Sequence, residues 1–174
     1  DKLTIEPKQE ILTNRKSKYI IESGNAYAII DDIDLAYNIF VDQVLTGKEG
    51  LCISRIIPKK IRDKYGLKKT PIMWLNDLVN GEYKTINSLS DCSILISDYL
   101  KKAKNPIILL DGLEYLVSVN EFNPVLRFLQ SRRSLIESTD SILLIPYNSQ
   151  AIEKKEHQLI IRELSTFKKN VLNK

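Results

Sequence analysis

The sequence contains few residues of the types that cross-link small proteins or bind metals. Among 174 residues there are two cysteines, one histidine, one methionine and one tryptophan. Cys52 and Cys92 lie far apart in apolar stretches, and His157 completes no usual metal-ligand spacing with them. This composition excludes a disulfide-rich scaffold and a zinc module. We therefore expect two reduced, buried thiols in a cytoplasmic protein that holds no metal and no cofactor.

Glycine, proline and long apolar runs are also scarce. Six glycines and six prolines, with 43% hydrophobic residues, exclude a collagen-like or disordered chain. The longest apolar runs, at 107–110 and 142–145, are far shorter than the roughly 20 residues that a membrane helix needs. We expect one compact domain. Because the chain begins at Asp1 and its only methionine is Met73, we also expect a piece of a longer protein, which leaves a preceding membrane segment open.

The N-terminal part of the chain differs in pattern from the rest. Residues 1–18 are polar and irregular, which indicates a linker or an N-terminal arm, and the domain is expected over 19–174. The β-prone run at 19–21 precedes a stronger one at 26–30. The pair predicts either a hairpin or a lead-in to a single buried strand.

From Tyr27 onward, strand and helix patterns alternate. The expected strands are 27–30, 50–54, 72–75, 106–110 and 142–145, and the expected helices are 33–46, one opened by Pro58, one capped by Ser90 or Asp91, 122–136 and 150–171. Such alternation predicts an α/β fold with three layers, doubly wound, whose mostly parallel sheet has about five strands.

The last expected helix carries a regular apolar stripe. Ile160, Leu164, Phe167 and Val171 are spaced by four, three and four residues, as in a heptad pattern. Two interpretations stay open, because core packing and partner docking use the same periodicity. The stripe belongs to a long core helix, or it is a helix interface that docks a protein partner or a second copy of the chain.

Two motifs give the sequence a family resemblance. Residues 50–58 read G-L-C-I-S-R-I-I-P, residues 109–116 read L-L-D-G-L-E-Y-L, and Met73-Trp74-Leu75 lies between them. From Tyr27 to Leu164 the chain resembles the archaeal family known as domain of unknown function 835. The resemblance implies a RecA-like core related to the KaiC group of ATPases, in proteins that often carry signalling modules. It implies no particular reaction.

The segment where such ATPases bind phosphate is different here. A phosphate loop has the form G-x-x-x-x-G-K-[S/T] between a strand and a helix. The corresponding segment is Asp31-Asp32-Ile33-Asp34, which has no glycine, lysine or hydroxyl. Carboxylates at a helix N-terminus cap its free N–H groups and so occupy the anion site themselves. We therefore expect no P-loop chemistry, no catalytic residues and no enzyme activity.

The apolar run 107–110 ends at Asp111, which is the form of a Walker B strand. The alternative is a strand-to-helix turn in which Asp111 accepts local N–H bonds. In open α/β sheets the ligand crevice lies beyond the carboxyl ends of the strands. The candidate pocket residues by that rule are Arg55, Trp74, Asp111, Glu114 and Tyr147. We expect Arg55 to form an ion pair with Asp111 or Glu114 as an internal counter-charge.

The charge is unevenly distributed along the chain. The net charge is +4, from 26 basic and 22 acidic residues. One acid, Asp63, stands among six bases that form a candidate patch for an anionic partner: Lys59, Lys60, Arg62, Lys64, Lys68 and Lys69. Nucleic acid, an anionic lipid surface and an acidic protein are all compatible with it. A single interleaved aromatic, Tyr65, and the lack of a recognition motif do not favour nucleic acid.

Together these patterns favour a non-catalytic regulatory or scaffolding module of archaeal signalling that acts through protein–protein contacts. The alternative is a nucleotide-binding protein or ATPase with a remodelled site, in which Asp111 binds metal and Arg55 binds phosphate. A weaker alternative is nucleic-acid binding through residues 59–69.

Overall fold

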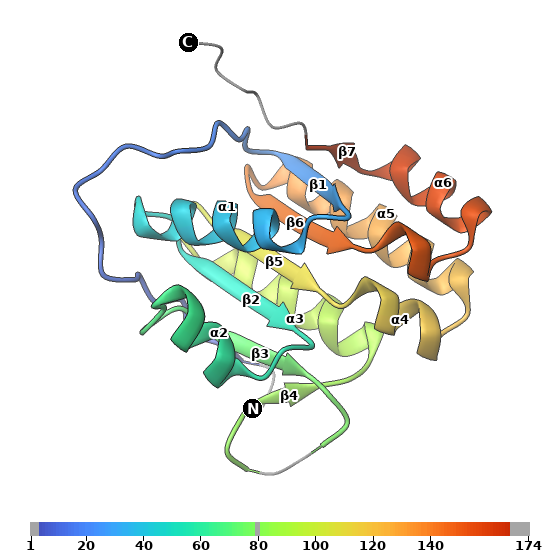
Figure 1. Ribbon diagram of the computed structural model, residues 1–174, viewed down its shortest axis with the longest axis horizontal. Helices are drawn as coiled ribbons and strands as arrows, with labels where there is room; N and C mark the ends of the chain where they lie inside the picture. The colour runs from blue at the N-terminus through green and yellow to red at the C-terminus, as the bar shows by residue number, and fades with distance from the viewer. Residues whose placement is uncertain (1–3, 79–80, 168–174) are drawn as a thin grey trace.

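The computed structural model describes residues 4–78 and 81–167. Within these residues one parallel sheet has the strand order β4-β3-β2-β5-β6-β1-β7 (Figure 1). Its strands are β1 (Asn25–Ile30), β2 (Gly50–Ser54), β3 (Ile72–Leu75), β4 (Thr85–Ile86), β5 (Ile107–Asp111), β6 (Ile142–Tyr147) and β7 (Ser165–Thr166). The helices are α1 (Ile33–Leu45), α2 (Pro58–Tyr65), α3 (Leu89–Lys102), α4 (Leu113–Val119), α5 (Phe122–Ser138), the short η1 (Ser149–Ala151) and α6 (Lys154–Glu163).

Helices cover both faces of the sheet, so the α/β, three-layer, doubly wound architecture is confirmed. Helices α1 and α2 lie on one face, and α3, α4 and α5 lie on the other (Figure 1). Central strands β2 and β5 are buried along their whole length, because a parallel sheet covered on both faces has no solvent side. Alternate side chains of β2 enter opposite layers: Leu51 and Ile53 join one core cluster and Cys52 joins the other.

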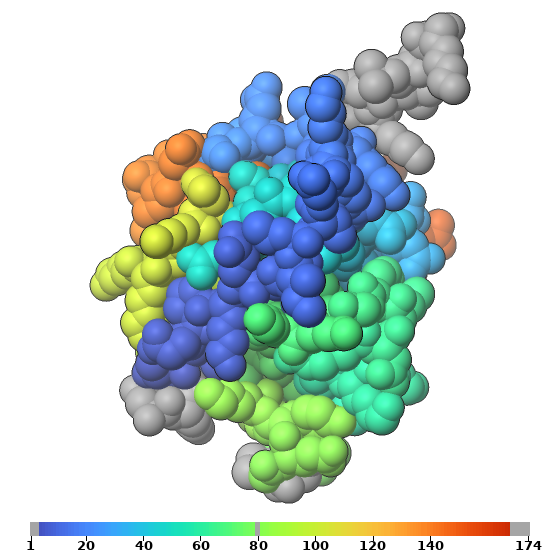
Figure 2. Space-filling model, turned by 90° about the vertical axis from the view of Figure 1, so that its left-hand side faces the viewer, coloured from blue at the N-terminus to red at the C-terminus, as the bar shows by residue number. Residues whose placement is uncertain are grey.

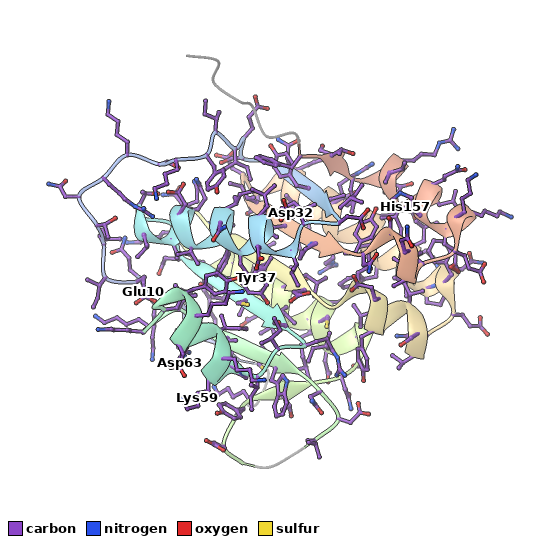
Figure 3. The ribbon with its side chains drawn as sticks, viewed as in Figure 1. Glu10, Asp32, Tyr37, Lys59, Asp63 and His157 are labelled. Carbon is purple, nitrogen blue, oxygen red and sulfur yellow. The ribbon has the colours of Figure 1, made fainter. Side chains whose placement is uncertain are left out.

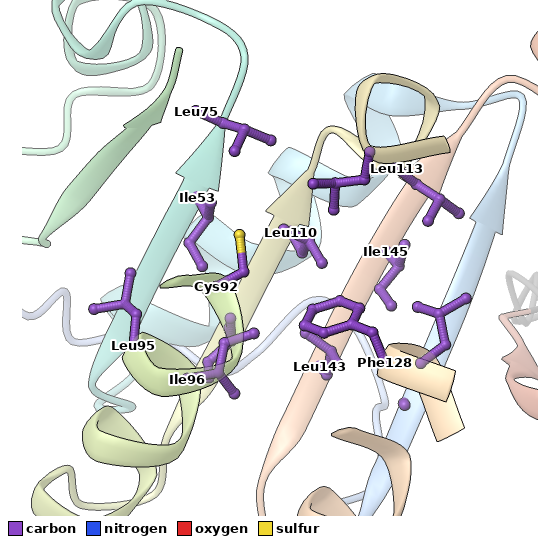
Figure 4. Packing of buried hydrophobic residues seen from close by; sticks show 14 of the residues in the cluster. Ile53, Leu75, Cys92, Leu95, Ile96, Leu110, Leu113, Phe128, Leu143 and Ile145 are labelled. Carbon is purple, nitrogen blue, oxygen red and sulfur yellow. The ribbon is translucent and has the colours of Figure 1, made fainter. Parts of the chain in front are cut away.

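The larger core cluster lies between the sheet and helices α3 and α5. Figure 4 shows its packing at close range, where strand side chains interdigitate with helix side chains. The strands contribute Ile53, Leu75, Leu110, Leu143 and Ile145, and the helices contribute Cys92, Leu95, Ile96, Leu113 and Phe128. All ten are less than a tenth exposed, so burial of this apolar surface is the main stabilisation of the fold.

Local signals place the starts of three helices. Asp32 caps α1, since its Oδ1 accepts a hydrogen bond of 3.0 Å from the Leu35 amide. Pro58 opens α2 at the position where its missing N–H costs nothing. Helix α3 begins earlier than expected, because Ser88 reaches the Asp91 amide at 3.0 Å and caps the helix two residues before Ser90.

Gly50 allows α1 to lie close to the start of β2. A Cβ at this position would stand 2.5 Å from Cγ1 of Val44 and 2.8 Å from Cζ of Phe40. Both neighbours are buried side chains of α1. Any larger residue would therefore push the helix away from the sheet.

Residues 4–24 contain no helix or strand, yet they are anchored to the domain (Figure 2). Ile5 enters the core. Glu10 is 4% exposed and accepts five hydrogen bonds from backbone amides and one hydroxyl of residues 68–70, at 2.8–3.2 Å. Asp42 of α1 accepts hydrogen bonds from residues 17–19. Residues 19–21 form no strand, so the lead-in interpretation holds and the hairpin does not.

The expected helix over 150–171 is wrong. Helix α6 ends at Glu163, and Leu164 adopts an extended backbone at its C-cap. The chain then pairs as β7 with β1, and the Phe167 amide donates to the Ala28 carbonyl at 3.2 Å. Pairing with β7 provides hydrogen-bond partners for backbone groups on the edge of β1, and a continued helix could not do so. The two-residue strands β4 and β7 also account for a sheet wider than the expected five strands, because such short segments have no periodic pattern.

Candidate functional site

A pocket of about 370 Å³ lies beyond the carboxyl ends of β1, β5 and β6. This is the edge where open α/β sheets bind their ligands. Four of its lining residues carry carboxylates, Asp31, Asp32, Asp111 and Glu114, and Pro146 and Tyr147 also line it. The sequence-predicted residues Asp111, Glu114 and Tyr147 are thus brought together here.

Asp111, at the end of β5, is the most buried carboxyl group of this pocket. Its side chain is 7% exposed. Oδ2 accepts hydrogen bonds from the hydroxyls of Tyr37, at 2.7 Å, and Ser54, at 3.1 Å. These partners are remote in sequence, so the expected local N–H bonds to this side chain are not what holds it. Tyr37 is itself stacked on Tyr65, with ring centroids 5.0 Å apart and planes 5° from parallel.

Burial shifts the pKa of this group. It raises the pKa of Asp111 above its ordinary value, while the two hydroxyl hydrogen bonds work in the opposite direction. The Tyr37 and Ser54 oxygens also lie 2.7 Å apart. The oxygens of Asp111, Tyr37 and Ser54 thus make three close contacts with one another, but the two hydroxyls provide only two hydrogens. A proton on Asp111 would supply the hydrogen for the third contact. Asp111 is therefore a buried acid whose carboxyl group makes its hydrogen bonds to other side chains of the protein.

The rim carboxylates connect loops to one another. Asp31, with a left-handed φ of 59°, accepts hydrogen bonds from the Ser149 amide at 2.7 Å and the Ser149 hydroxyl at 2.8 Å. Those bonds lower the pKa of Asp31. Glu114 accepts a 2.6 Å hydrogen bond from the Asn148 amide. Each acid thus ties the edge of the pocket to the segment after β6 and leaves the rim negatively charged.

Tyr147 and His157 form a second pair that the sequence did not suggest. The Tyr147 hydroxyl and His157 Nδ1 lie 3.1 Å apart, and the rings meet edge to face. Burial raises the pKa of Tyr147, so its hydroxyl stays protonated. His157 lies on α6, ten residues from its partner, and no sequence pattern links helix α6 to the end of β6.

Arg55 and Trp74 lie outside this pocket. The exposed Arg55 donates a 2.7 Å hydrogen bond to the Leu75 carbonyl, and its guanidinium lies 4.1 Å from the centroid of the Tyr115 ring. Among the described residues it forms no ion pair. The expected pairing with Asp111 or Glu114 is therefore wrong, because the Leu75 carbonyl and the Tyr115 ring hold the guanidinium instead. Trp74 donates from Nε1 to the Arg55 carbonyl at 3.2 Å.

The six bases of the sequence-predicted patch divide in space. Lys59, Arg62 and Lys69 line a second pocket of about 670 Å³, between the N-terminal segment, α2 and the chain before β4. The others, Lys60, Lys64 and Lys68, do not line it. Two of the six bases pair with acids: Lys59 with Asp63 at 2.7 Å (Figure 3) and Lys64 with Asp34 at 3.1 Å.

The apolar stripe near the C-terminus is used inside the domain. Ile160 and Leu164 are buried in the larger core cluster. Phe167 meets Tyr27 edge to face, with ring centroids 6.0 Å apart. These three side chains therefore present no exposed stripe, and Val171 lies outside the described residues.

Neither cysteine is part of a disulfide. Cys52 and Cys92 are free and buried, and burial raises the pKa of Cys92 to about 12. Over residues 4–78 and 81–167, no cluster of three or more histidine, cysteine or acidic side chains has a geometry that could hold a metal ion. In the same ranges, every helix is too short or too polar to cross a membrane.

Comparison with known proteins adds a fold and a family. The flagellar accessory protein FlaH from Methanocaldococcus jannaschii has a similar structure, with a TM-score of 0.55 and 12% sequence identity over 90% of this chain and 77% of that one. At this identity the likeness shows the fold alone, which is RecA-like. No curated protein sequence matches the chain significantly. The sequence profile of the family described as "Protein of unknown function (DUF835)" matches residues 29–164. The chain belongs to the DUF835 family.

Proposed function

We propose that this RecA-like domain is a non-catalytic regulatory or scaffolding module of archaeal signalling, and that it acts through protein–protein contacts. The observation that carries the proposal is the junction of β1 and α1. In a working ATPase of this fold, the amides at this helix N-terminus bind phosphate. Here Asp32 binds the Leu35 amide at 3.0 Å, so the chain's own carboxylate occupies the anion position.

The charges around that junction support the same proposal. Asp31, Asp32 and Glu114 line one pocket, and no lysine or arginine is among its lining residues in the described part of the chain. The phosphates of a nucleotide would meet carboxylates in place of a cationic cradle. Close like charges cost more as water is excluded, because the effective dielectric constant falls.

Asp111 supports the proposal in a second way. A Walker B acid acts by holding Mg²⁺. One oxygen of Asp111 is already shared by the Tyr37 and Ser54 hydroxyls, and burial favours the protonated acid. The residue thus serves as a structural link between α1, β2 and β5.

A second candidate function is a nucleotide-binding protein or ATPase with a remodelled site. The observation that favours it is the place of the 370 Å³ pocket, at the ligand edge of the sheet and beside Asp111. Its volume lies within the usual range for small-molecule sites.

Thermal unfolding with Mg-ATP separates the two functions. A ligand that binds only the native state at about 100 times its Kd adds about 2.7 kcal/mol, which corresponds to a rise in Tm of about 5 to 10 °C for a domain of this size. We expect ~5 mM Mg-ATP to leave Tm unchanged within about 1 °C, the same as Mg²⁺ with inorganic phosphate. A saturable rise specific to the nucleotide would favour the second function and reject the proposal.

A further inference from the structure

A groove on the other side of the molecule brings together bases from three separate segments. It is the second pocket described above, of about 670 Å³. Figure 2 shows the face where the N-terminal segment meets α2 and the chain before β4. The bases on its lining are Lys8 from the first segment, Lys59 and Arg62 from α2, Lys69 after α2, and Lys84 before β4. We call this feature the basic groove.

Four of these bases have no acidic partner among the residues that the structure describes. Within the described residues Lys8, Arg62, Lys69 and Lys84 form no ion pair. Arg62 donates a long hydrogen bond, 3.4 Å, to the Leu67 carbonyl. Their positive charge is therefore available to an occupant of the groove.

The acids of the groove are already engaged. Asp63 lies 2.7 Å from Lys59, and Glu6 lies 3.3 Å from Lys102. The third acid, Glu82, interacts with the Tyr83 hydroxyl. The groove thus combines uncommitted bases with acids that hold partners of their own, so its free charge is positive.

The position of the groove is set by buried contacts. Glu10 is bound by residues 68–70, which holds the first segment against the chain that follows α2. Ile5 and Ile72, both less than a tenth exposed, form part of its lining, together with Pro58 and Pro71. The bases therefore surround a fixed, partly apolar floor.

We propose that the basic groove binds an acidic peptide segment of a partner protein. This inference rests on the proposed function, because the basic groove would be the surface through which the protein–protein contact is made. Acidic side chains of an extended peptide would pair with Lys8, Arg62, Lys69 and Lys84, and its apolar side chains would cover the proline and isoleucine floor.

A peptide fits this pattern better than a nucleic acid does. Glu6, Asp63 and Glu82 interrupt the bases, so a backbone with a charge at every unit would meet carboxylates as well as lysines. A peptide can carry its acidic side chains at intervals, so it can pair with the bases without placing a charge beside each acid of the groove. Tyr83 is the aromatic residue on the lining, whereas single-stranded nucleic acids are usually held by several stacked aromatics.

The test measures fluorescence anisotropy of a short labelled peptide of alternating glutamate and alanine against the full chain. Its counterpart with glutamine in place of glutamate is the charge control, and a single-stranded DNA of equal length is the competing class. The groove variant carries Lys69→Glu and Lys84→Glu. The matched control carries Lys60→Glu and Lys68→Glu, which change net charge equally at bases that do not line the groove.

We expect binding of the glutamate peptide at ~50 mM NaCl that weakens at ~300 mM, since salt screens exposed charges. The groove variant should bind about tenfold more weakly or worse, and the matched control within about twofold to threefold of wild type. Equal losses in both variants, no binding of the glutamate peptide, equal binding of the glutamine peptide, or tighter binding of DNA would each overturn the proposal. None of these outcomes involves Mg-ATP, so the proposed function stands or falls separately.

Discussion

The hydroxyl of Tyr37 donates a 2.7 Å hydrogen bond to Oδ2 of Asp111 across 74 residues of sequence. Ser54 contacts both atoms, so α1, β2 and β5 are joined at one buried point. The acid at the end of β5 is thereby committed to the interior of the fold. The segment that ends at Asp111 has the sequence form of a Walker B strand, whereas the contacts of its side chain are structural.

Replacing Tyr37 with phenylalanine should destabilise the protein by about 1 to 2 kcal/mol, because a buried carboxyl group loses a donor. Tyr65→Phe is the matched control. Tyr65 stacks on the same ring, and its hydroxyl interacts with exposed side chains, namely Lys64 and, at 3.5 Å, Asp34. Urea unfolding at neutral pH measures both changes. Equal losses would show that the buried hydrogen bond to Asp111 contributes no more to stability than the exposed hydroxyl of Tyr65.

Stability should depend on pH through Asp111 in a direction unusual for a carboxyl group. Its pKa is raised by burial, so the folded state keeps the proton to a higher pH than the unfolded state, whose ordinary value is 3.8. The stability that this group contributes is complete below the pKa of the unfolded state. It is lost as the pH rises through the pKa of the folded state. Urea unfolding of wild type and Asp111→Asn across this range should show the wild-type advantage shrinking as pH rises; a constant difference would contradict it.

Glu10 should show the opposite trend. Burial alone would raise its pKa, but hydrogen bonds from Thr70, Lys69 and Lys68 outweigh it and lower the pKa from 4.5 to about 2. Wild type should therefore exceed Glu10→Gln in stability above about pH 4.5, by at most ~3 kcal/mol, and lose that advantage as pH falls toward 2.

Glu6→Gln is the control for that series. Glu6 is exposed and pairs with Lys102 at 3.3 Å, so its loss should cost less than about 1 kcal/mol. If Glu10→Gln behaves like Glu6→Gln at every pH, the anchoring role of Glu10 is rejected.

Gly50→Ala should destabilise the protein by about 1 to 3 kcal/mol, because a methyl group would overlap Val44 and Phe40. Gly66→Ala separates this effect from backbone strain. Gly66 has a φ of 69° with open space around it, so alanine there should cost about 1 kcal/mol through conformation alone. Thermal unfolding of both variants gives the comparison. A smaller loss at Gly50 than at Gly66 would mean that α1 shifts freely to accommodate the methyl group.

Local patterns in the sequence were sufficient for much of the architecture. The Asp32 cap, the start of α2 at Pro58 and the buried run ending at Asp111 depend on neighbours within four residues. These interactions are the same wherever the segment lies in the fold. The parallel sheet followed from their alternation.

The errors have a common cause. Arg55 was expected near an acid, but the Leu75 carbonyl and the Tyr115 ring hold it, and both come from other elements. The periodic stripe that includes Leu164 continues past α6, but the chain leaves the helix there to pair with β1. In each case a contact from a distant segment outweighed a local preference.

The sequence by itself determined most of the elements, their order and the acidic β1–α1 junction that lacks a phosphate-loop motif, because periodicity and capping act over a few residues. Only the tertiary structure decided which charges meet. It placed Tyr37 against Asp111, tied the first segment to the domain through Glu10, and gathered Lys8 and Lys84 at the basic groove. Side chains far apart in sequence interact only once packing brings their elements together, and that arrangement depends on the whole core.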